Sequence, residues 1–187
     1  MTEKEKVIAE AALRVFARYG VKRATMNDVA QEADLVRQTL YNVFPNKDAL
    51  LRGTIRFYAD SLRQTVQAEW AGVETLSEKL DILFAHFVVS SWQMLHGSPD
   101  AQDLDRGVNA EGRAELLEVG KRTRDMLAGL FAPYDSRLSS AGSDHTLLAD
   151  FVQNAMNGIK HEGEDLDHVQ SLVATLKAAV LSLTGEM

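Results

Sequence analysis

The sequence predicts an all-α protein of about nine helices, on three observations. Apolar residues recur at the 3.6-residue helical period along the chain, and no stretch shows the alternation of a β-strand. The 187 residues include only three prolines. Pairs of Thr with an acid three residues later, which cap helix starts, precede apolar runs at Thr2, Thr25 and Thr75. We expect an N-terminal three-helix head over residues 1–46 and a larger helical domain over residues 47–187.

The head is predicted to contain three helices, the last two of them short. The first spans about residues 3–19 and ends at Gly20, since glycine favours helix C-termini. The second spans about 26–33 and the third about 37–43, which ends ahead of Pro45 because the residue before proline avoids the helical region. Only three residues separate the second and third helices, which is the arrangement of a helix-turn-helix.

The larger domain is predicted to consist of longer helices. Asn46 caps the first of them. Their expected ranges are 47–70, 76–96, a short helix at 100–106, 109–131, 144–160 and 166–184, with residues 132–143 as a loop.

Several classes of site and location are disfavoured by composition. No run of eighteen apolar residues is present, and the charged start lacks the features of a secretory signal, so we expect no membrane partner. The chain has no cysteine, which excludes disulfides and thiolate ligands, and a reducing cytoplasm is the expected location. The five histidines show no metal-binding spacing, and no catalytic or nucleotide-binding motif occurs. We therefore expect that the protein binds no metal ion and no cofactor and that it is not an enzyme.

Charge is distributed unevenly along the chain. The net charge is −7, yet residues 1–53 hold nine Lys/Arg against seven Asp/Glu and carry +2, which leaves −9 for the remainder. An acidic body repels phosphate, so any contact with DNA is expected only at the N-terminal end. Chance variation in surface charge is the alternative interpretation.

The third predicted helix carries polar side chains suited to the edges of base pairs. Arg37 and Gln38 lie at its start, and Thr39, Tyr41 and Asn42 follow. Arginine pairs with guanine, glutamine or asparagine with adenine, and a threonine methyl contacts thymine. A short helical hairpin in a structural bundle would show the same pattern, so the pattern alone leaves both interpretations open.

Two segments of the head resemble the N-terminal signature of the TetR repressor family. The first runs from Ile8 to Gly20 and continues over Thr25–Ala33, and the second is Thr39-Leu40-Tyr41-Asn42-Val43-Phe44-Pro45-Asn46-Lys47-Asp48-Ala49-Leu50. The resemblance covers about residues 7–55. It implies a DNA-binding head, a dimer interface and a ligand pocket in the C-terminal helices.

The resemblance also implies roles for individual residues. Tyr41 and Lys47 match positions that bind DNA phosphates. Thr25 matches a helix cap that often also contacts the DNA backbone. The positions that commonly contact DNA bases are matched by Arg37, Gln38 and Asn42. Thr39 matches a position that faces either the bases or the DNA backbone. Two positions depart from the family's Ala-Gly-Val-Ser turn: Asp34 replaces the glycine, and Val36 replaces the serine that caps the third helix.

Candidate residues for the larger domain follow from its apolar helices. Two adjacent apolar helices could form half of an intermolecular four-helix bundle, and the expected interface residues are Phe151, Ala155, Val169, Leu172, Leu176 and Val180. The expected pocket residues, suited to a small hydrophobic or amphipathic effector, are Tyr58, Leu62, Phe84, Phe87, Trp92, Asn109, Arg113 and Asn154. The alternative is ordinary core burial for the interface residues and the apolar pocket residues, and a surface position for the polar pocket residues.

The resulting hypothesis is a ligand-responsive repressor that binds double-stranded DNA as a homodimer. An all-helical ligand-binding or adaptor protein that does not bind specific DNA sequences is the alternative, and a small helical enzyme is a third. The sequence identifies neither the effector nor the operator.

Overall fold

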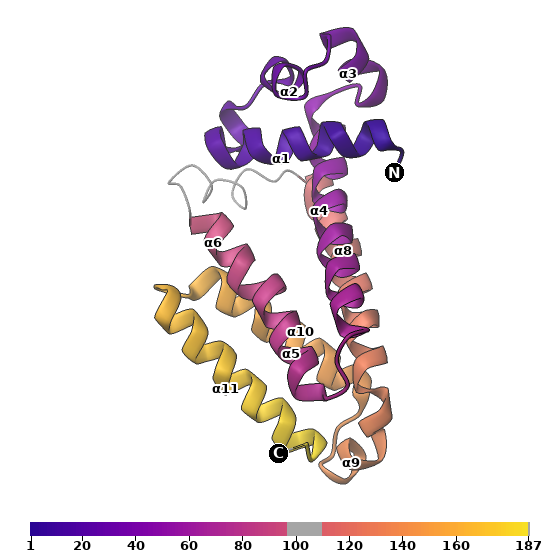
Figure 1. Ribbon diagram of the computed structural model, residues 1–187, viewed down its shortest axis with the longest axis vertical. Coiled ribbons are helices and arrows are strands. Elements are labelled where there is room, and N and C mark those ends of the chain that lie inside the picture. Colours follow the sequence, from indigo (N-terminus) through magenta and orange to yellow (C-terminus); the bar gives the residue numbers. More distant parts are fainter. Residues whose placement is uncertain (97–109, 187) are drawn as a thin grey trace. The chain divides into compact units, whose positions relative to one another are not determined.

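The computed structural model describes residues 1–96 and 110–186, and within these residues all regular structure is helical (Figure 1). This confirms the predicted fold class. The elements are α1 (Glu3–Arg23), α2 (Met26–Glu32), α3 (Arg37–Val43), α4 (Lys47–Trp70), α5 (Leu76–Phe84), the π-helical turn η1 (Ala85–Ser90), α6 (Ser91–His96), α8 (Ala110–Phe131), the 3₁₀ turn η2 (Ala132–Tyr134), α9 (Asp135–Ser140), α10 (His145–Glu162) and α11 (Leu166–Thr184).

The chain divides into two compact units. Unit 1 comprises Met1–Ser61 with the described part of Met94–Val119, and unit 2 comprises Leu62–Gln93 with Gly120–Met187. The long helices α4 and α8 each contribute residues to both units. The helix-turn-helix segment lies entirely in unit 1.

Unit 1 is built around α1, against which α2 and α3 pack (Figure 1). A capping box between Thr2 and Glu5 starts α1, as predicted. Gly20 interrupts the helical backbone with φ 71° and ψ 156°, and one further turn leads to Arg23. The helix therefore stops at the predicted glycine. The buried core of the unit is Ile8, Ala11, Ala12, Val15, Phe16, Val21, Ala24, Met26, Val29, Ala30, Leu40, Phe44, Leu50 and Leu51.

Unit 2 has a larger core, to which α5, η1, α8, α10 and α11 all contribute. The predicted helix 76–96 is continuous but contains one wide turn at η1, where the Ser90 and Ser91 hydroxyls donate to carbonyls five residues earlier. The Trp92 indole N–H donates to the Gly163 carbonyl at 3.0 Å. The Lys177 ammonium lies 2.6 Å from both carboxylate oxygens of Asp81, which joins α11 to α5.

The prediction of a loop over residues 132–143 is wrong. Residues 132–143 contain the 3₁₀ turn η2 and the helix α9. Pro133 lies at the start of η2, where proline's missing N–H costs nothing. Leu138 is fully buried and fixes α9 against the core of unit 2, so tertiary packing converts a loop-like composition into helix. The short helix expected at 100–106 lies outside the described residues.

We predict that Gly163→Ala destabilises the protein. An added Cβ at this position would lie 2.8 Å from the Ile159 carbonyl and 3.2 Å from the Trp92 indole nitrogen. Overpacking of this kind typically costs about 1–3 kcal/mol, and urea unfolding would measure that loss in the free energy of unfolding.

Gly129→Ala is the matched control. Gly129 is exposed within α8, and a Cβ there meets nothing within 4 Å. This variant is expected to gain about 0.5–1 kcal/mol, because alanine loses less backbone entropy than glycine in a helix. Equal behaviour of the two variants would show that the packing around Gly163 is not tight.

Candidate nucleic-acid interface

Helix α3, which carries the candidate base-reading residues, is held in place from its inner side. Leu40 is fully buried in the core of unit 1, and Phe44, which follows the helix, is 7% exposed. The Phe44 ring occupies the space above Gly53 of α4, where an added Cβ would come within 2.5 Å of its Cε1 atom. With these two side chains buried, the opposite face of α3 is left to solvent.

The outward face of α3 carries the predicted base-reading residues in two hydrogen-bonded pairs. The Arg37 guanidinium donates to the Tyr41 hydroxyl at 3.3 Å and lies 5.3 Å from the centre of its ring. The Gln38 amide donates to the Asn42 amide oxygen at 3.0 Å. Arg37, Gln38 and Asn42 are exposed, whereas Tyr41 is half-buried. These side chains are partly ordered before any ligand arrives.

Thr39 lies on the same helix and is half-buried. Its backbone N–H donates to the Val36 carbonyl at 2.9 Å. Thr39 thus follows Arg37 and Gln38 in α3, and its role at the candidate interface stays a prediction.

The turn between α2 and α3 has the two departures noted in the sequence. Asp34 adopts a left-handed backbone with φ 52°, which aspartate tolerates better than most residues. Val36 occupies the N-cap position and provides no side-chain hydrogen bond to α3. Both local expectations are confirmed, and the turn remains tight, since the Leu35 N–H donates to the Ala30 carbonyl at 2.9 Å.

Thr25 forms a capping box with Asp28 at the start of α2, as predicted. Its hydroxyl accepts from the Asp28 N–H at 3.2 Å and donates to the Asp28 carboxylate at 2.7 Å. This hydrogen bond, followed by one from the Thr25 backbone N–H, lowers the pKa of Asp28 below its ordinary value. Thr25 is exposed, but its hydroxyl already serves the cap.

Lys47 joins two elements of unit 1. Its ammonium donates to the Lys22 carbonyl at 3.0 Å, near the end of α1. The side chain is half-buried, and this burial lowers its pKa, opposed by the negative charges of Asp48 and Asp28. The lysine expected at a phosphate therefore also fixes the start of α4 to α1. The partner carbonyl at Lys22 could not be found from sequence, because a backbone acceptor leaves no residue signal.

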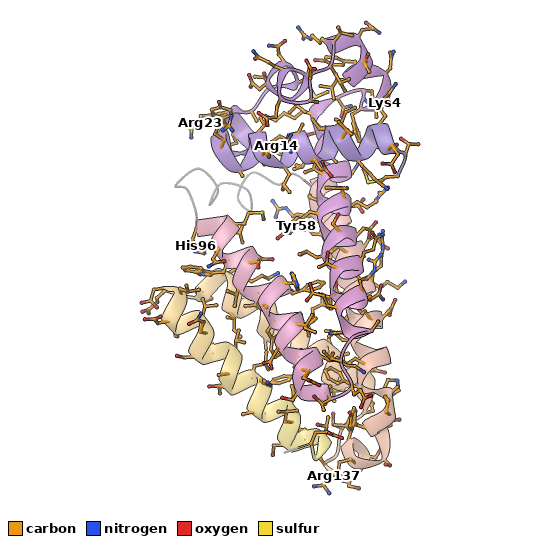
Figure 2. All side chains as sticks on the ribbon, in the orientation of Figure 1. Lys4, Arg14, Arg23, Tyr58, His96 and Arg137 are labelled. Carbon is orange, nitrogen blue, oxygen red and sulfur yellow. The ribbon has the colours of Figure 1, made fainter. Side chains whose placement is uncertain are left out.

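Further basic residues lie along α1. Figure 2 shows Lys4 near its start, Arg14 in its middle and Arg23 at its end. Arg14 pairs with Glu32 of α2 at 2.7 Å, and Arg18 lies 3.7 Å from the same carboxylate. Glu32 thus offsets positive charge in the middle of α1. The basic residues Lys22 and Arg23 lie at the C-terminal end of α1, close in sequence to the start of α2.

The described candidate pocket residues are divided between the two units. Phe84 and Phe87 are buried in the core of unit 2, Leu62 and Trp92 are packed against that core, and Tyr58 and Arg113 belong to unit 1. Arg113 is exposed. Asn109 lies outside the described residues.

Asn154, the remaining pocket candidate, is exposed on α10. Its amide donates to the Asp150 carbonyl of its own helix at 2.8 Å. Gln153 beside it is a residue that the sequence analysis missed. It is 7% exposed, and its buried amide oxygen has no hydrogen-bond partner among the residues that the structure describes. Its polar side chain on an apolar helix was the signal available.

The candidate interface residues of α10 and α11 differ in exposure. Val169, Leu176 and Val180 are buried in the protomer's own core, and Leu172 and Ala155 are half-buried. Phe151 is 52% exposed, and Leu147, one turn earlier and not among the candidates, is 56% exposed. The apolar surface on the outside of α10 is therefore formed by Leu147 and Phe151.

The described residues contain neither a membrane-spanning helix nor a cluster of metal ligands. No helix there has the length and apolar character needed to cross a membrane. Within residues 1–96 and 110–186, no group of three or more His, Asp or Glu side chains is arranged to hold a metal ion.

Comparison with known proteins gives a family match in the head and two sequence relatives. The family model for bacterial regulatory proteins of the tetR family matches residues 8–54. A 60-residue segment is 38% identical to YuxN, an uncharacterized HTH-type transcriptional regulator of Bacillus subtilis strain 168, and covers 32% of this chain. A 139-residue segment is 27% identical to the HTH-type transcriptional regulator BetI of Rhizobium meliloti strain 1021 and covers 69% of this chain. The matches span 21% of YuxN and 65% of BetI.

Solved structures resemble the fold over nearly its whole length. The fatty acid degradation regulator FadR of Bacillus halodurans matches with a TM-score of 0.71 and 18% identity, covering 94% of this chain and 95% of its own. FadR of Bacillus subtilis, solved in complex with stearoyl-CoA, matches with a TM-score of 0.58 and 22% identity, covering 95% and 96%. A putative TetR-family regulator from Rhodococcus sp. matches with a TM-score of 0.70 and 17% identity. The match covers 98% of this chain and 100% of that protein.

The family match lies over α1, α2, α3 and the start of α4, the elements that hold Leu40 inward and Arg37 outward. Both sequence relatives are HTH-type transcriptional regulators. Residues 8–54 therefore match the tetR family of bacterial regulatory proteins, and the fold of the chain resembles that of solved TetR-family regulators.

Proposed function

We propose that this protein is a ligand-responsive transcriptional repressor that binds a palindromic operator as a homodimer. Residues 1–46 would form the DNA-binding domain, and residues 47–187 would bind the effector and the second copy. The observation that carries the proposal is the polar outer face of α3, on a helix whose inner face is anchored by Leu40.

On this proposal, α3 enters the major groove and α2 lies across the backbone. Arg37, Gln38 and Asn42 would read base edges, which requires the Arg37–Tyr41 and Gln38–Asn42 hydrogen bonds to open. Tyr41, Lys47 and Thr25 would contact phosphates, and Thr39 would face either. The side-chain pairing supports specificity, because a wrong base pair would not replace the hydrogen bonds given up.

Homodimerisation is supported by the outer face of α10. Leu147 and Phe151 are spaced one turn apart and are more than half exposed. Ala155 and Gly158 continue the same side of the helix with small residues. Such an apolar stripe on a helix surface is typical of helix-bundle interfaces, so we place the partner's contact there.

An effector site is supported by Gln153 in unit 2. A buried amide oxygen without a donor costs about 1–3 kcal/mol, and a ligand N–H or O–H would satisfy it. The apolar residues around it on α10, including Val152 and Met156, favour a hydrophobic or amphipathic molecule. One fold neighbour, FadR of Bacillus subtilis, has been solved with stearoyl-CoA, an amphipathic compound.

Effector binding would release DNA by favouring a dimer in which the two recognition helices no longer match one operator. An effector shifts the equilibrium between the two dimer conformations only by the difference in its affinity for them. The two heads would read half-sites about one DNA turn, or a multiple of it, apart.

We predict that Lys47→Ala and Gln38→Ala weaken DNA binding in different ways. Loss of a phosphate contact should weaken binding to all duplexes and reduce the salt-dependence slope by about one unit. Gln38→Ala should instead alter which sequence is preferred, by about 1–3 kcal/mol at one base pair. Fluorescence anisotropy over a salt series, with a duplex selected from a random pool, measures both effects.

A folding control accompanies this test, because Lys47 also bonds to the Lys22 carbonyl. Thermal unfolding of Lys47→Ala reports the loss of that bond separately from the loss of DNA affinity. Indistinguishable sequence preference and salt dependence in the two variants would contradict the division of roles.

We predict that Leu147→Asp produces a monomer. A carboxylate placed on the apolar stripe would have to be desolvated in the interface, which costs several kcal/mol. Leu117→Asp is the matched control, since Leu117 is 74% exposed on α8 and lies outside the stripe. Sedimentation equilibrium should give a dimer for the wild type and the control. A dimeric Leu147→Asp protein would place the interface elsewhere.

We predict that Gln153→Leu raises the melting temperature of the ligand-free protein while abolishing its response to an effector. The apolar replacement removes the unpaired oxygen, and with it about 1 kcal/mol of desolvation cost. Gln67→Leu, on the exposed side of α4, is the control and should change neither property. The probes are fatty acids, fatty alcohols and acyl-CoA thioesters in a DNA-release assay. An unchanged response in Gln153→Leu would exclude Gln153 from the effector site.

A further inference from the structure

Val36 is unusual for its place in the helix-turn-helix. It occupies the N-cap of α3, a position where Ser, Asn and Asp are strongly preferred and valine is disfavoured. Its side chain is 71% exposed, directly before the base-reading candidates Arg37 and Gln38. Single exposed apolar residues are common on protein surfaces. Here, however, the exposed valine also takes the place of a hydrogen-bonding cap.

The local backbone compensates for the missing cap. A capping side chain would accept a hydrogen bond from the Thr39 N–H. Here that N–H donates to the Val36 carbonyl at 2.9 Å. The Leu40 N–H also points to this carbonyl, at 3.4 Å. The first turn of α3 is therefore closed by backbone alone, and the Val36 isopropyl group takes no part in holding the helix.

The chemistry of the side chain limits what it could recognise on DNA. An isopropyl group neither donates nor accepts a hydrogen bond, so it gains nothing from a phosphate or from the polar edges of bases. The major groove presents one apolar group, the C5-methyl of thymine, and apolar side chains contact it. Residues at the start of a recognition helix are those that reach base edges.

We propose that Val36 is a specificity-determining residue that packs against a thymine C5-methyl group in each half-site. The inference rests on the DNA-binding function proposed above. Arg37 and Gln38 supply hydrogen bonds to neighbouring base pairs, and Val36 adds discrimination by a methyl group alone. Serine at this position would cap α3 better but would lose that discrimination, which accounts for an uncapped valine at an exposed site.

The test replaces thymine by uracil, which removes only the methyl group. An operator is first selected from a random duplex pool, and each of its thymines is then changed singly to uracil. We expect one thymine per half-site at which uracil weakens wild-type binding about fourfold, or about 0.8 kcal/mol at 1.4 kcal/mol per tenfold. In Val36→Ser that uracil effect should disappear, and in Val36→Thr, which keeps one methyl, it should be reduced.

Two controls separate recognition from folding. Val36→Ser restores a cap, so its melting temperature should rise while its uracil sensitivity is lost. Val7→Ser, at a valine that is 48% exposed on α1, should retain the full uracil effect. Equal uracil sensitivity in the wild type and Val36→Ser would overturn the inference while leaving the repressor function intact. Failure to select any duplex would overturn both.

Discussion

The orientation of helix α3 depends on the burial of Leu40 and Phe44. A helix of seven residues is too short to be stable alone in water, so α3 takes its conformation and its direction from the core of unit 1. Leu40 is its one fully buried residue, and the Phe44 ring fits only because Gly53 leaves room for it. These two contacts direct the outer face of α3 toward solvent, so on the proposed function a substitution in the core would alter DNA recognition without contacting DNA.

The parts of the structure that follow from local chemistry were predictable from the sequence. The capping boxes at Thr2, Thr25 and Thr75 form as expected, and Asn46 caps α4 through a bond to the Ala49 N–H. The left-handed Asp34 follows in the same way. These features depend on residues three or four positions apart, which a sequence displays directly. The bounds of α3 and α4 also agree with the predicted ranges, because α3 ends ahead of Pro45 and Asn46 caps α4.

Features decided by packing were not predictable. The 132–143 segment becomes partly helical because the core of unit 2 receives Leu138. On α10 and α11 nearly every side carries apolar residues, so the sequence could not tell that Val169 faces the protomer's own core while Phe151 faces outward. The wide turn at η1 and, among the described residues, the unpaired amide oxygen of Gln153 were also not predicted from the sequence. Local patterns identify helices, but which face is buried is a property of the assembled unit.

The capping boxes have a consequence for the response to acid. Hydrogen bonds from the capping threonines lower the pKa of Glu5 and Glu78, as they do for Asp28. A carboxyl whose pKa is lowered on folding binds fewer protons folded than unfolded, so its contribution is complete at neutral pH and fades as the pH drops below the ordinary carboxyl range. The three boxes begin α1 and α2 in one unit and α5 in the other. Acidification would thus fray helix starts in both halves of the molecule together, as a diffuse loss of order with no single titrating switch.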